Sequence, residues 1–146
     1  CLISLALIDA ESAVPAVIAA SRSEVTDIRS VATYTLGVLG SEASTTRLVE
    51  ALDDRAPPVR WNAAFGLARY GNTAGESVII EILDRGPIYQ ATATEPEKQR
   101  EQFLNALQSA GMLRTPKLMQ KLEQIAVDDA DLKARDLAKK LVEVRR

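Results

Sequence analysis

The acidic residues are the clearest candidates for chemistry in this chain of 146 residues, which contains no histidine. The chain therefore lacks the commonest general base, triad member and metal ligand, and its lone Cys1 has no histidine with which to pair. Asp53 and Asp54 could act as a carboxylate pair, and the acidic segment at residues 128–131 resembles part of a calcium loop. That segment lacks the glycine at the sixth position and the distant Glu of such a loop, so we interpret it as a helix cap.

A phosphate-binding loop is a second possibility, at Gly71–Gly75. Such a loop needs a strand before its glycines and a Lys followed by Ser or Thr after them. The residues around Gly71–Gly75 meet neither requirement. The residue types therefore favour a protein that is not an enzyme, and we expect no catalytic residue, no metal site and no cofactor.

The segments that would position these side chains repeat along the chain. Each copy has an Arg, a Leu and a Gly at the same spacing, and the copies are Arg29, Leu36 and Gly40, then Arg60, Leu67 and Gly71, then Arg100, Leu107 and Gly111. The first step is 31 residues, which indicates a stacked array of similar units. The second step is 40 residues, so we predict an insertion of nine residues over residues 86–94.

Apolar residues spaced by three and four positions predict that the repeating units are helices. Over residues 25–39 they predict a helix whose buried face consists of Val25, Ile28, Val31, Ala32, Leu36 and Leu39. Its partner is expected over residues 42–53, with an inward face of Leu48, Val49 and Leu52. Further helices are expected over residues 1–9 and 13–20, and from about residues 59, 76, 95, 116 and 132 onwards.

Capping residues predict where these helices begin and end. The expected N-terminal residues are Ser23, Thr115 and the capping-box pairs Thr73–Glu76 and Thr94–Glu97. Pro15 is expected in the first turn of its helix, where a proline loses no intrahelical hydrogen bond. The expected stops are glycines able to adopt a positive φ, at Gly40, Gly71 and Gly111.

Composition limits the class of partner. With 47% hydrophobic and 26% charged residues, the chain is expected to be folded and soluble, with the cytoplasm favoured. Its formal charge of −2 gives no general attraction for nucleic acid or an anionic membrane, and the apolar run from Leu2 to Ile8 is too short to span a bilayer. That run continues a helix face directly, so we interpret Cys1 as a truncation point in a longer chain rather than as a lipidated N-terminus.

The stretch around Arg60 carries a family resemblance. Asp53–Asp54 before Val59–Arg60, followed by Ala63–Ala64, Leu67 and Gly71, resembles the HEAT-like repeat, in the short-period variety of phycobilisome lyases and bacterial scaffold proteins. The resemblance implies an all-α fold, an α-α superhelix (solenoid) of stacked antiparallel helical hairpins with about four and a half repeats. It implies one domain over 1–146, with repeats at 1–22, 23–54, 55–85, 95–127 and 129–146. It also implies that the residues tying adjacent repeats together are Arg29, Arg60, Asp53, Asp54 and Asp84.

The resemblance also implies a partner-binding face, because the second helix of each HEAT-like pair lines the concave surface. The residues expected on that face are Thr46, Arg47, Glu50, Ser77, Glu81, Lys117 and Lys121. Trp61 and Tyr89 are added because the repeat does not explain them. The alternatives left open are an ordinary solvated face for the helices, packing for Trp61 and a disordered spacer for the insertion.

We therefore hypothesise a non-catalytic protein–protein interaction scaffold, which binds a protein partner through the concave second-helix face and the insertion at 86–96. The alternative functions are a phycobilin lyase-like factor for chromophore attachment and a HEAT-like nucleic-acid-binding protein or DNA glycosylase. The even charge balance and the scarcity of aromatic residues argue against the last of these. Nothing in the sequence indicates which protein is bound or what the oligomeric state is.

Overall fold

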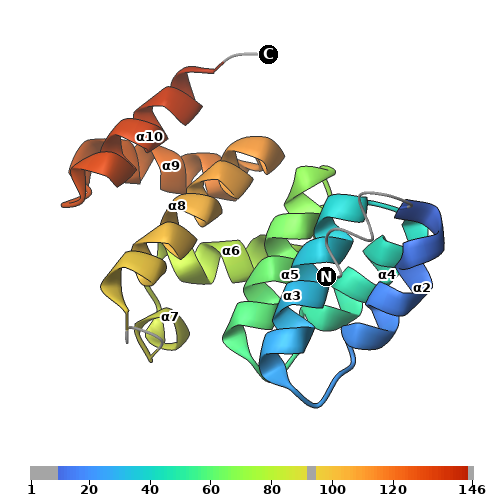
Figure 1. Ribbon diagram of the computed structural model, residues 1–146. Helices are drawn as coiled ribbons and strands as arrows, with labels where there is room; N and C mark the ends of the chain where they lie inside the picture. The colour runs from blue at the N-terminus through green and yellow to red at the C-terminus, as the bar shows by residue number, and fades with distance from the viewer. Residues whose placement is uncertain (1–9, 92–94, 145–146) are drawn as a thin grey trace. The chain divides into compact units, whose positions relative to one another are not determined.

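Helices make up the regular structure of the described part of the chain, residues 10–91 and 95–144 of a computed structural model (Figure 1). The helices are α2 (Ala10–Ala20), α3 (Thr26–Leu39), α4 (Glu42–Ala51), α5 (Pro57–Arg69), the 3₁₀ helix η1 (Thr73–Gly75), α6 (Glu76–Leu83), α7 (Pro87–Ala91), α8 (Pro96–Leu113), α9 (Pro116–Asp128) and α10 (Leu132–Glu143). The predicted all-α helical repeat class is confirmed. The helix predicted over residues 1–9, the interpretation of Cys1 and the cap at Thr94 lie outside the described residues.

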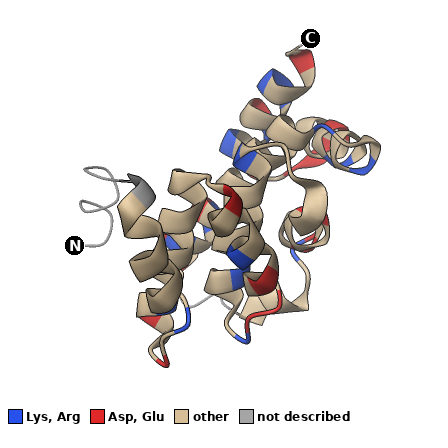
Figure 2. Cartoon of the chain, turned by 90° about the vertical axis from the view of Figure 1, so that its right-hand side faces the viewer, with Lys and Arg blue, Asp and Glu red and all other residues tan. Residues whose placement is uncertain are grey.

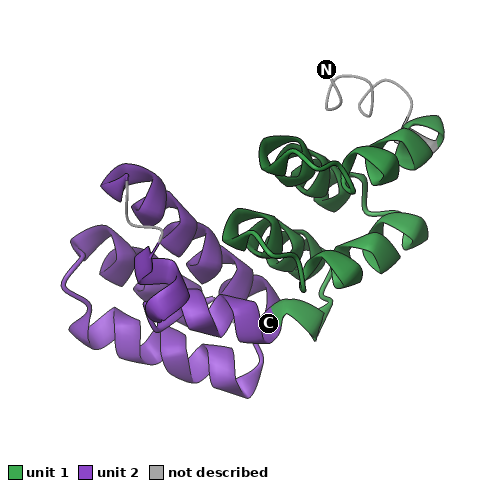
Figure 3. Ribbon diagram, turned by 90° about the horizontal axis from the view of Figure 1, so that it is seen from below, with its two compact units in different colours: residues 1–75 green, residues 76–146 purple. Residues whose placement is uncertain are grey.

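The chain divides into two compact units, unit 1 (Cys1–Gly75) and unit 2 (Glu76–Arg146) (Figure 3). The division falls between η1 and α6, and therefore inside the repeat predicted over residues 55–85. The prediction of a single domain stays a prediction, and we describe each unit by itself.

The core of unit 1 lies between its first helices, α3 and α5, and its second helices, α2 and α4. Its buried cluster consists of Val17, Ala32, Leu36, Leu48, Ala51, Val59, Ala63 and Leu67. Two glycines in helix interiors allow α3 and α5 to approach closely: a Cβ on Gly66 would lie 2.8 Å from the Cα of Gly37. Because main chain faces main chain at this point, neither helix can give way to a side chain there.

The inward face of α3 differs from the predicted one. Val25, Ile28 and Val31 are 53%, 43% and 45% exposed, so their prediction as buried residues is wrong. The residues that face inward are small or polar, namely Arg29, Ala32, Thr33, Thr35, Leu36 and Gly37. The hydroxyls of Thr33 and Thr35 donate to the carbonyl oxygens of Arg29 and Val31, at 2.7 and 2.9 Å. Because each buried hydroxyl is satisfied within the helix, these residues can occupy the close α3–α5 contact.

Unit 2 contains the insertion and the C-terminal helices. Here α10 packs against α8 and α9, and α6 packs against α8, α9 and the short α7. Its fully buried larger side chains are Phe103, Ile79, Ile82, Leu107, Leu118 and Leu122. The predicted insertion is therefore partly helical, since α7 occupies residues 87–91 within it.

The structure confirms part of the predicted capping. The hydroxyl of Thr115 accepts from the N–H of Leu118 at 3.3 Å. Gly40 ends α3 with φ 65°, and Gly71 follows α5 with φ 75°. Gly111 was predicted to end its helix, and that prediction is wrong: α8 continues to Leu113 and ends at Arg114, which has φ 51°. Gly111 instead gives room to α10, because a Cβ there would lie 2.6 Å from Cδ2 of Leu141.

Three helix starts also differ from the prediction. Ser23 accepts from the N–H of Val25 at 3.1 Å and so forms a turn before α3, whose N-cap is Val25 itself. Thr73 begins η1 instead of capping α6, and Asn72 accepts from the N–H of Ala74 at 2.9 Å. Pro15 lies in the interior of α2, because that helix already begins at Ala10. A local sequence pattern placed each cap within a few residues but could not fix its position.

Candidate partner-binding surfaces

The turns between repeats share one hydrogen-bond pattern, which lies at Ser23–Arg29, Asp54–Arg60 and Asp129–Arg135. The first side chain of each turn accepts from the N–H two residues later, at 2.9 to 3.1 Å. The arginine at its end donates to the carbonyl oxygen six residues earlier, at 3.0, 2.6 and 2.7 Å respectively. The pattern fixes how the chain enters each first helix.

In unit 1 an ion pair ties the start of α3 to the turn before α5, and it joins two of the residues predicted for such a tie, Arg29 and Asp54. Nε and Nη2 of Arg29 donate to the two carboxylate oxygens of Asp54 at 3.0 and 3.2 Å, and the side chains are only 5% and 10% exposed. Burial raises the pKa of Asp54, but the hydrogen bonds from Arg29 and from the N–H of Ala56 outweigh it and hold this pKa below its usual value. The pair is therefore charged and structural.

In unit 2, which contains the insertion, the arginines and aspartates form different ion pairs. Asp129 receives a bidentate pair from Arg85 at 2.9 and 3.1 Å, although Arg85 lies at the end of α6. Arg100, the sequence counterpart of Arg29, pairs with Asp131 through Nε at 2.6 Å. That hydrogen bond, opposed by burial, lowers the pKa of Asp131. Asp84 pairs with Lys121, as part of the predicted tie at the helix turns.

The acidic segment at residues 128–131 serves as a helix cap, as interpreted. Asp131 accepts from the N–H groups of Lys133 and Ala134 at 2.9 and 3.4 Å and caps α10. Its remaining oxygen is bound by Arg100, and both oxygens of Asp129 are bound by Arg85. Among the described residues, no three acidic or cysteine side chains come together as a metal-ion site would require.

Arg135 is a member of the turn pattern that the sequence comparison missed. The comparison aligned Arg29 and Arg60 with Arg100, whereas Arg135 makes the same bond to a carbonyl six residues earlier. An acidic or hydroxyl residue six positions before each arginine was the available signal. The Leu and Gly spacing obscured it, because the positions seven and eleven residues after Arg135 are Val142 and Arg146.

The glycines at 71–75 have structural roles. Gly71 ends α5 with a positive φ, and Gly75 lies against α5, where a Cβ would be 2.7 Å from the Cα of Ala64. The intervening residues form η1. Helix termination and close packing therefore account for both glycines without a phosphate.

The predicted face on α4 is only partly free. Arg47 donates to the hydroxyl and carbonyl oxygens of Ser21 at 2.8 and 2.9 Å and also contacts Glu50. Glu50 is paired with Arg22 as well, at 3.2 Å. Thr46 is exposed, and its hydroxyl donates to the carbonyl of Glu42 at 3.2 Å. Arg47 thus belongs to the contact between repeats, and Thr46 and Glu50 remain on the surface.

In unit 2 the corresponding residues are also divided between packing and surface. Glu81 accepts from the N–H of Tyr89 at 3.2 Å and so holds the insertion, and Lys121 pairs with Asp84. Ser77 and Lys117 are exposed. The residues predicted to form one partner-binding face are distributed over both units, so the continuity of that face stays a prediction. Charged residues in general lie mainly at turns and helix ends (Figure 2).

Both aromatic residues proposed for partner binding are buried. Trp61 is 4% exposed, which corresponds to the packing alternative. Tyr89 is 5% exposed, its hydroxyl donates to the carbonyl of Gln99 at 2.9 Å, and Gln99 donates back to the carbonyl of Tyr89 at 2.9 Å. Burial raises the pKa of Tyr89, although the charge of Arg85 opposes the shift. We therefore correct the assignment of these two rings as contact residues.

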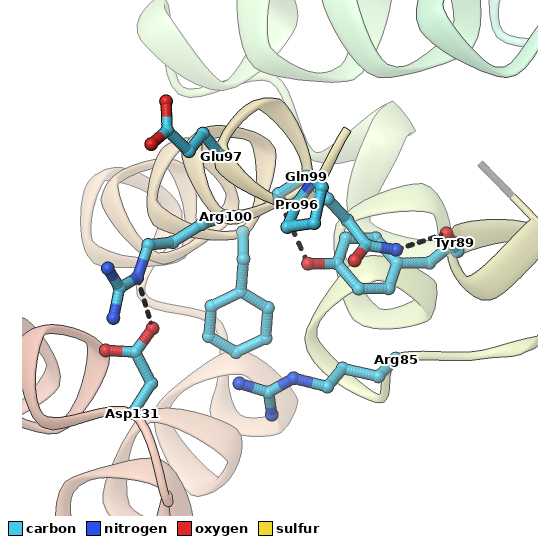
Figure 4. A pocket seen from close by; sticks show the side chains of 8 residues that line it. Arg85, Tyr89, Pro96, Glu97, Gln99, Arg100 and Asp131 are labelled. Carbon is cyan, nitrogen blue, oxygen red and sulfur yellow. Dashed lines mark hydrogen bonds and ion pairs between the residues drawn. The ribbon is translucent and has the colours of Figure 1, made fainter. Parts of the chain in front are cut away.

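A pocket of about 320 Å³ in unit 2 lies between Tyr89 of the insertion, the start of α8 and the turn before α10 (Figure 4). The guanidinium of Arg85 stacks over the ring of Phe103 at 3.9 Å from its centroid, and Tyr89 lies tilted against the same ring at 6.3 Å. Arg100 and Asp131 close another side (Figure 4). The residues that line the pocket contact one another within unit 2. We therefore interpret these residues primarily as the packing contacts of the insertion.

A larger cavity, of about 800 Å³, lies between the second helices of unit 1. It is lined by Val14 and Pro15 of α2, by Leu39 and Ser41, and by Glu42, Ala43 and Thr46 of α4. Thr46 is thus the residue at which the predicted second-helix face coincides with this cavity. The volume is within the range of about 300–1,000 Å³ typical of ligand pockets.

The repeated turns and paired helices define the class of an α-helical repeat protein. The family model for HEAT repeats matches residues 1–68, which supports a HEAT-like repeat protein. The comparison with curated proteins found no match. Of the helices in residues 10–91 and 95–144, none has both the length and the apolar character needed to cross a membrane. The phycobilisome-lyase subtype stays a prediction.

Proposed function

We propose that this chain is a non-catalytic protein-interaction scaffold that binds a partner protein through its second-helix face and its insertion. The observation that carries this proposal is the cavity between α2 and α4, because an exposed residue predicted to bind a partner, Thr46, lines it. HEAT repeats commonly act as protein-interaction scaffolds, and their second helices line the concave surface.

In the insertion, we propose an exposed neighbour of Tyr89 as the contact residue in place of Tyr89 itself. Tyr89 is buried, whereas Ile88 on the same short helix is 44% exposed. Repeat insertions map to loops on one face of an array and often carry function. The partner surface we propose thus includes Thr46 and Glu50 on α4 and Ile88 on α7.

Site-specific photo-crosslinking tests this assignment. A benzophenone amino acid replaces Thr46 or Ile88, and the matched controls replace Asp27 on α3 and Gln108 on α8, which are also exposed. In extract of the source organism, we expect defined protein adducts at Thr46 and Ile88 that the controls do not give. The same adducts at Thr46 and at Asp27 would exclude the second-helix face as the binding surface.

The alternative functions have direct tests of their own. A chromophore lyase acquires visible absorbance on incubation with a bilin, and a nucleic-acid enzyme binds DNA with strongly salt-dependent affinity. Either result would replace the scaffold proposal. The scaffold proposal expects neither of them.

A further inference from the structure

The cavity between α2 and α4 has apolar walls and polar groups that are already satisfied. Val14, Pro15, Leu39 and Ala43 supply the apolar surface. Ser41 accepts from the N–H of Ser44 at 3.1 Å and donates to its hydroxyl at 2.8 Å. Because the hydroxyl of Thr46 is bound to a main-chain carbonyl, the hydroxyls of the walls favour no particular polar ligand.

One charge remains at the rim of this cavity. Among the described residues that line it, Glu42 alone is ionisable, and its carboxylate has no partner in the described part of the chain. The facing helix α2 has no Lys or Arg between Ala10 and Ala20. On α4, the one basic residue, Arg47, is committed to Ser21 and Glu50. The cavity is therefore apolar, and the negative charge at its rim is not neutralised by a basic residue of α2 or α4.

We infer that this cavity binds a segment of the partner protein in which an aliphatic side chain lies next to a Lys or Arg. The inference rests on the proposed function and specifies the chemistry of its partner. The aliphatic side chain contacts Val14, Pro15 and Leu39, and the basic group pairs with Glu42. A cavity of about 800 Å³ has room for several residues of such a segment.

Glu42 also has a local role, which the experiment must separate from binding. It is the first residue of α4, where an acidic side chain stabilises the helix through its dipole. Glu76 is the first residue of α6 and is a matched control, because it has the same position in its helix and does not line this cavity. A purely local role predicts equal consequences for the two substitutions.

The test is selection of peptides from a random dodecapeptide library on the whole chain, on Glu42→Lys and on Glu76→Lys. We expect the parent and Glu76→Lys to select peptides with an aliphatic residue next to Lys or Arg, and Glu42→Lys to select acidic peptides. Glu42→Gln should weaken a peptide selected on the parent by roughly two- to fivefold, as expected of an exposed ion pair. Ala43→Trp, which fills the cavity, should abolish binding while the far-ultraviolet circular dichroism is unchanged.

Three results would overturn the inference. These are a lack of enriched peptides, the same peptides on the parent and on Glu42→Lys, or unchanged binding to a folded Ala43→Trp variant. In each case a specific adduct at Thr46 would still support the scaffold function. The loss of that adduct as well would remove the proposed function itself.

Discussion

The two units use the same repeat elements but join them differently. In unit 1 the main chains of α3 and α5 meet at Gly37 and Gly66, and the Arg29–Asp54 pair is almost fully buried. In unit 2 a glycine of α8 faces a side chain of α10, and the Arg100–Asp131 pair is 47% and 20% exposed. The equivalent arginines, Arg29 and Arg100, therefore differ in energetic importance, because burial and not residue type sets the cost of losing a contact.

This comparison predicts the largest difference for the arginines. Arg29→Ala should destabilise unit 1 by about 3–5 kcal/mol, because it leaves the Asp54 carboxylate buried without its partner. Arg100→Ala should have a much smaller effect on unit 2, because its guanidinium is solvated. Urea unfolding followed by Trp61 fluorescence, which reports unit 1, and by circular dichroism, which reports both units, provides the measurement. Equal losses for the two variants would contradict the comparison.

Truncation of the equivalent leucines should cause similar losses of stability, but in different units. Leu67 and Leu107 are 1% and 0% exposed, so Leu67→Ala and Leu107→Ala should each cost about 2–5 kcal/mol. Leu67→Ala should lower the midpoint of the Trp61 fluorescence transition, and Leu107→Ala should act mainly on the circular dichroism. An unchanged midpoint for Leu67→Ala would contradict its placement in the core of unit 1.

Substitution of the two glycines by Ala should change the free energy of unfolding to different extents. Ala is favoured over Gly in a helix interior by about 1 kcal/mol, but at Gly66 the added Cβ would meet main chain at 2.8 Å. We expect Gly66→Ala to be destabilising by about 1–2 kcal/mol. At Gly111 the obstacle is the flexible end of Leu141, so Gly111→Ala should be within about 1 kcal/mol of neutral. Thermal unfolding of both variants tests this, and stabilisation by Gly66→Ala would disprove the close contact.

The dependence of stability on acidic pH should show the smallest difference between the two units. The pKa of Asp54 is lowered in the folded state, so its contribution is complete above its unfolded pKa of about 3.9 and is lost as the pH falls below it. Asp54→Asn should therefore flatten the pH dependence of unit 1 stability below about pH 4. Asp131→Asn should change it less in unit 2, because that carboxylate is more exposed. Midpoints measured across this pH range provide the check, and the reverse order would count against the burial argument.

The sequence was sufficient to predict several elements of the fold because their signals are local. Helices over α3, α4 and α9, the cap at Thr115 and the stops at Gly40 and Gly71 follow from spacing and backbone preference. The candidate surface was harder to predict from the sequence. Thr46 was predicted and lines the cavity, but Glu42 was not singled out, because its significance depends on uncharged walls contributed by α2 and the α3–α4 turn.

The burial of particular faces could not be predicted from hydrophobicity alone. Val31 is more hydrophobic than Thr33, yet Thr33 is buried and Val31 is exposed. Close packing at Gly37 selects small side chains, and the helix itself satisfies the threonine hydroxyl. Trp61 and Tyr89 illustrate the same limit, because their large rings were interpreted as exposed anchors and are instead buried.

The sequence by itself determined the class of the protein: the period of 31 residues, the helical spacing and the recurring arginines indicate a HEAT-like helical repeat. Only the tertiary structure decided which carboxylate each arginine binds, which glycines bring helices together and where a cavity opens. The period and the helices result from interactions between residues a few positions apart. The pairings depend on which residues of different helices lie close together, and in the unit that contains the insertion it is Arg85, outside the repeat motif, that binds Asp129.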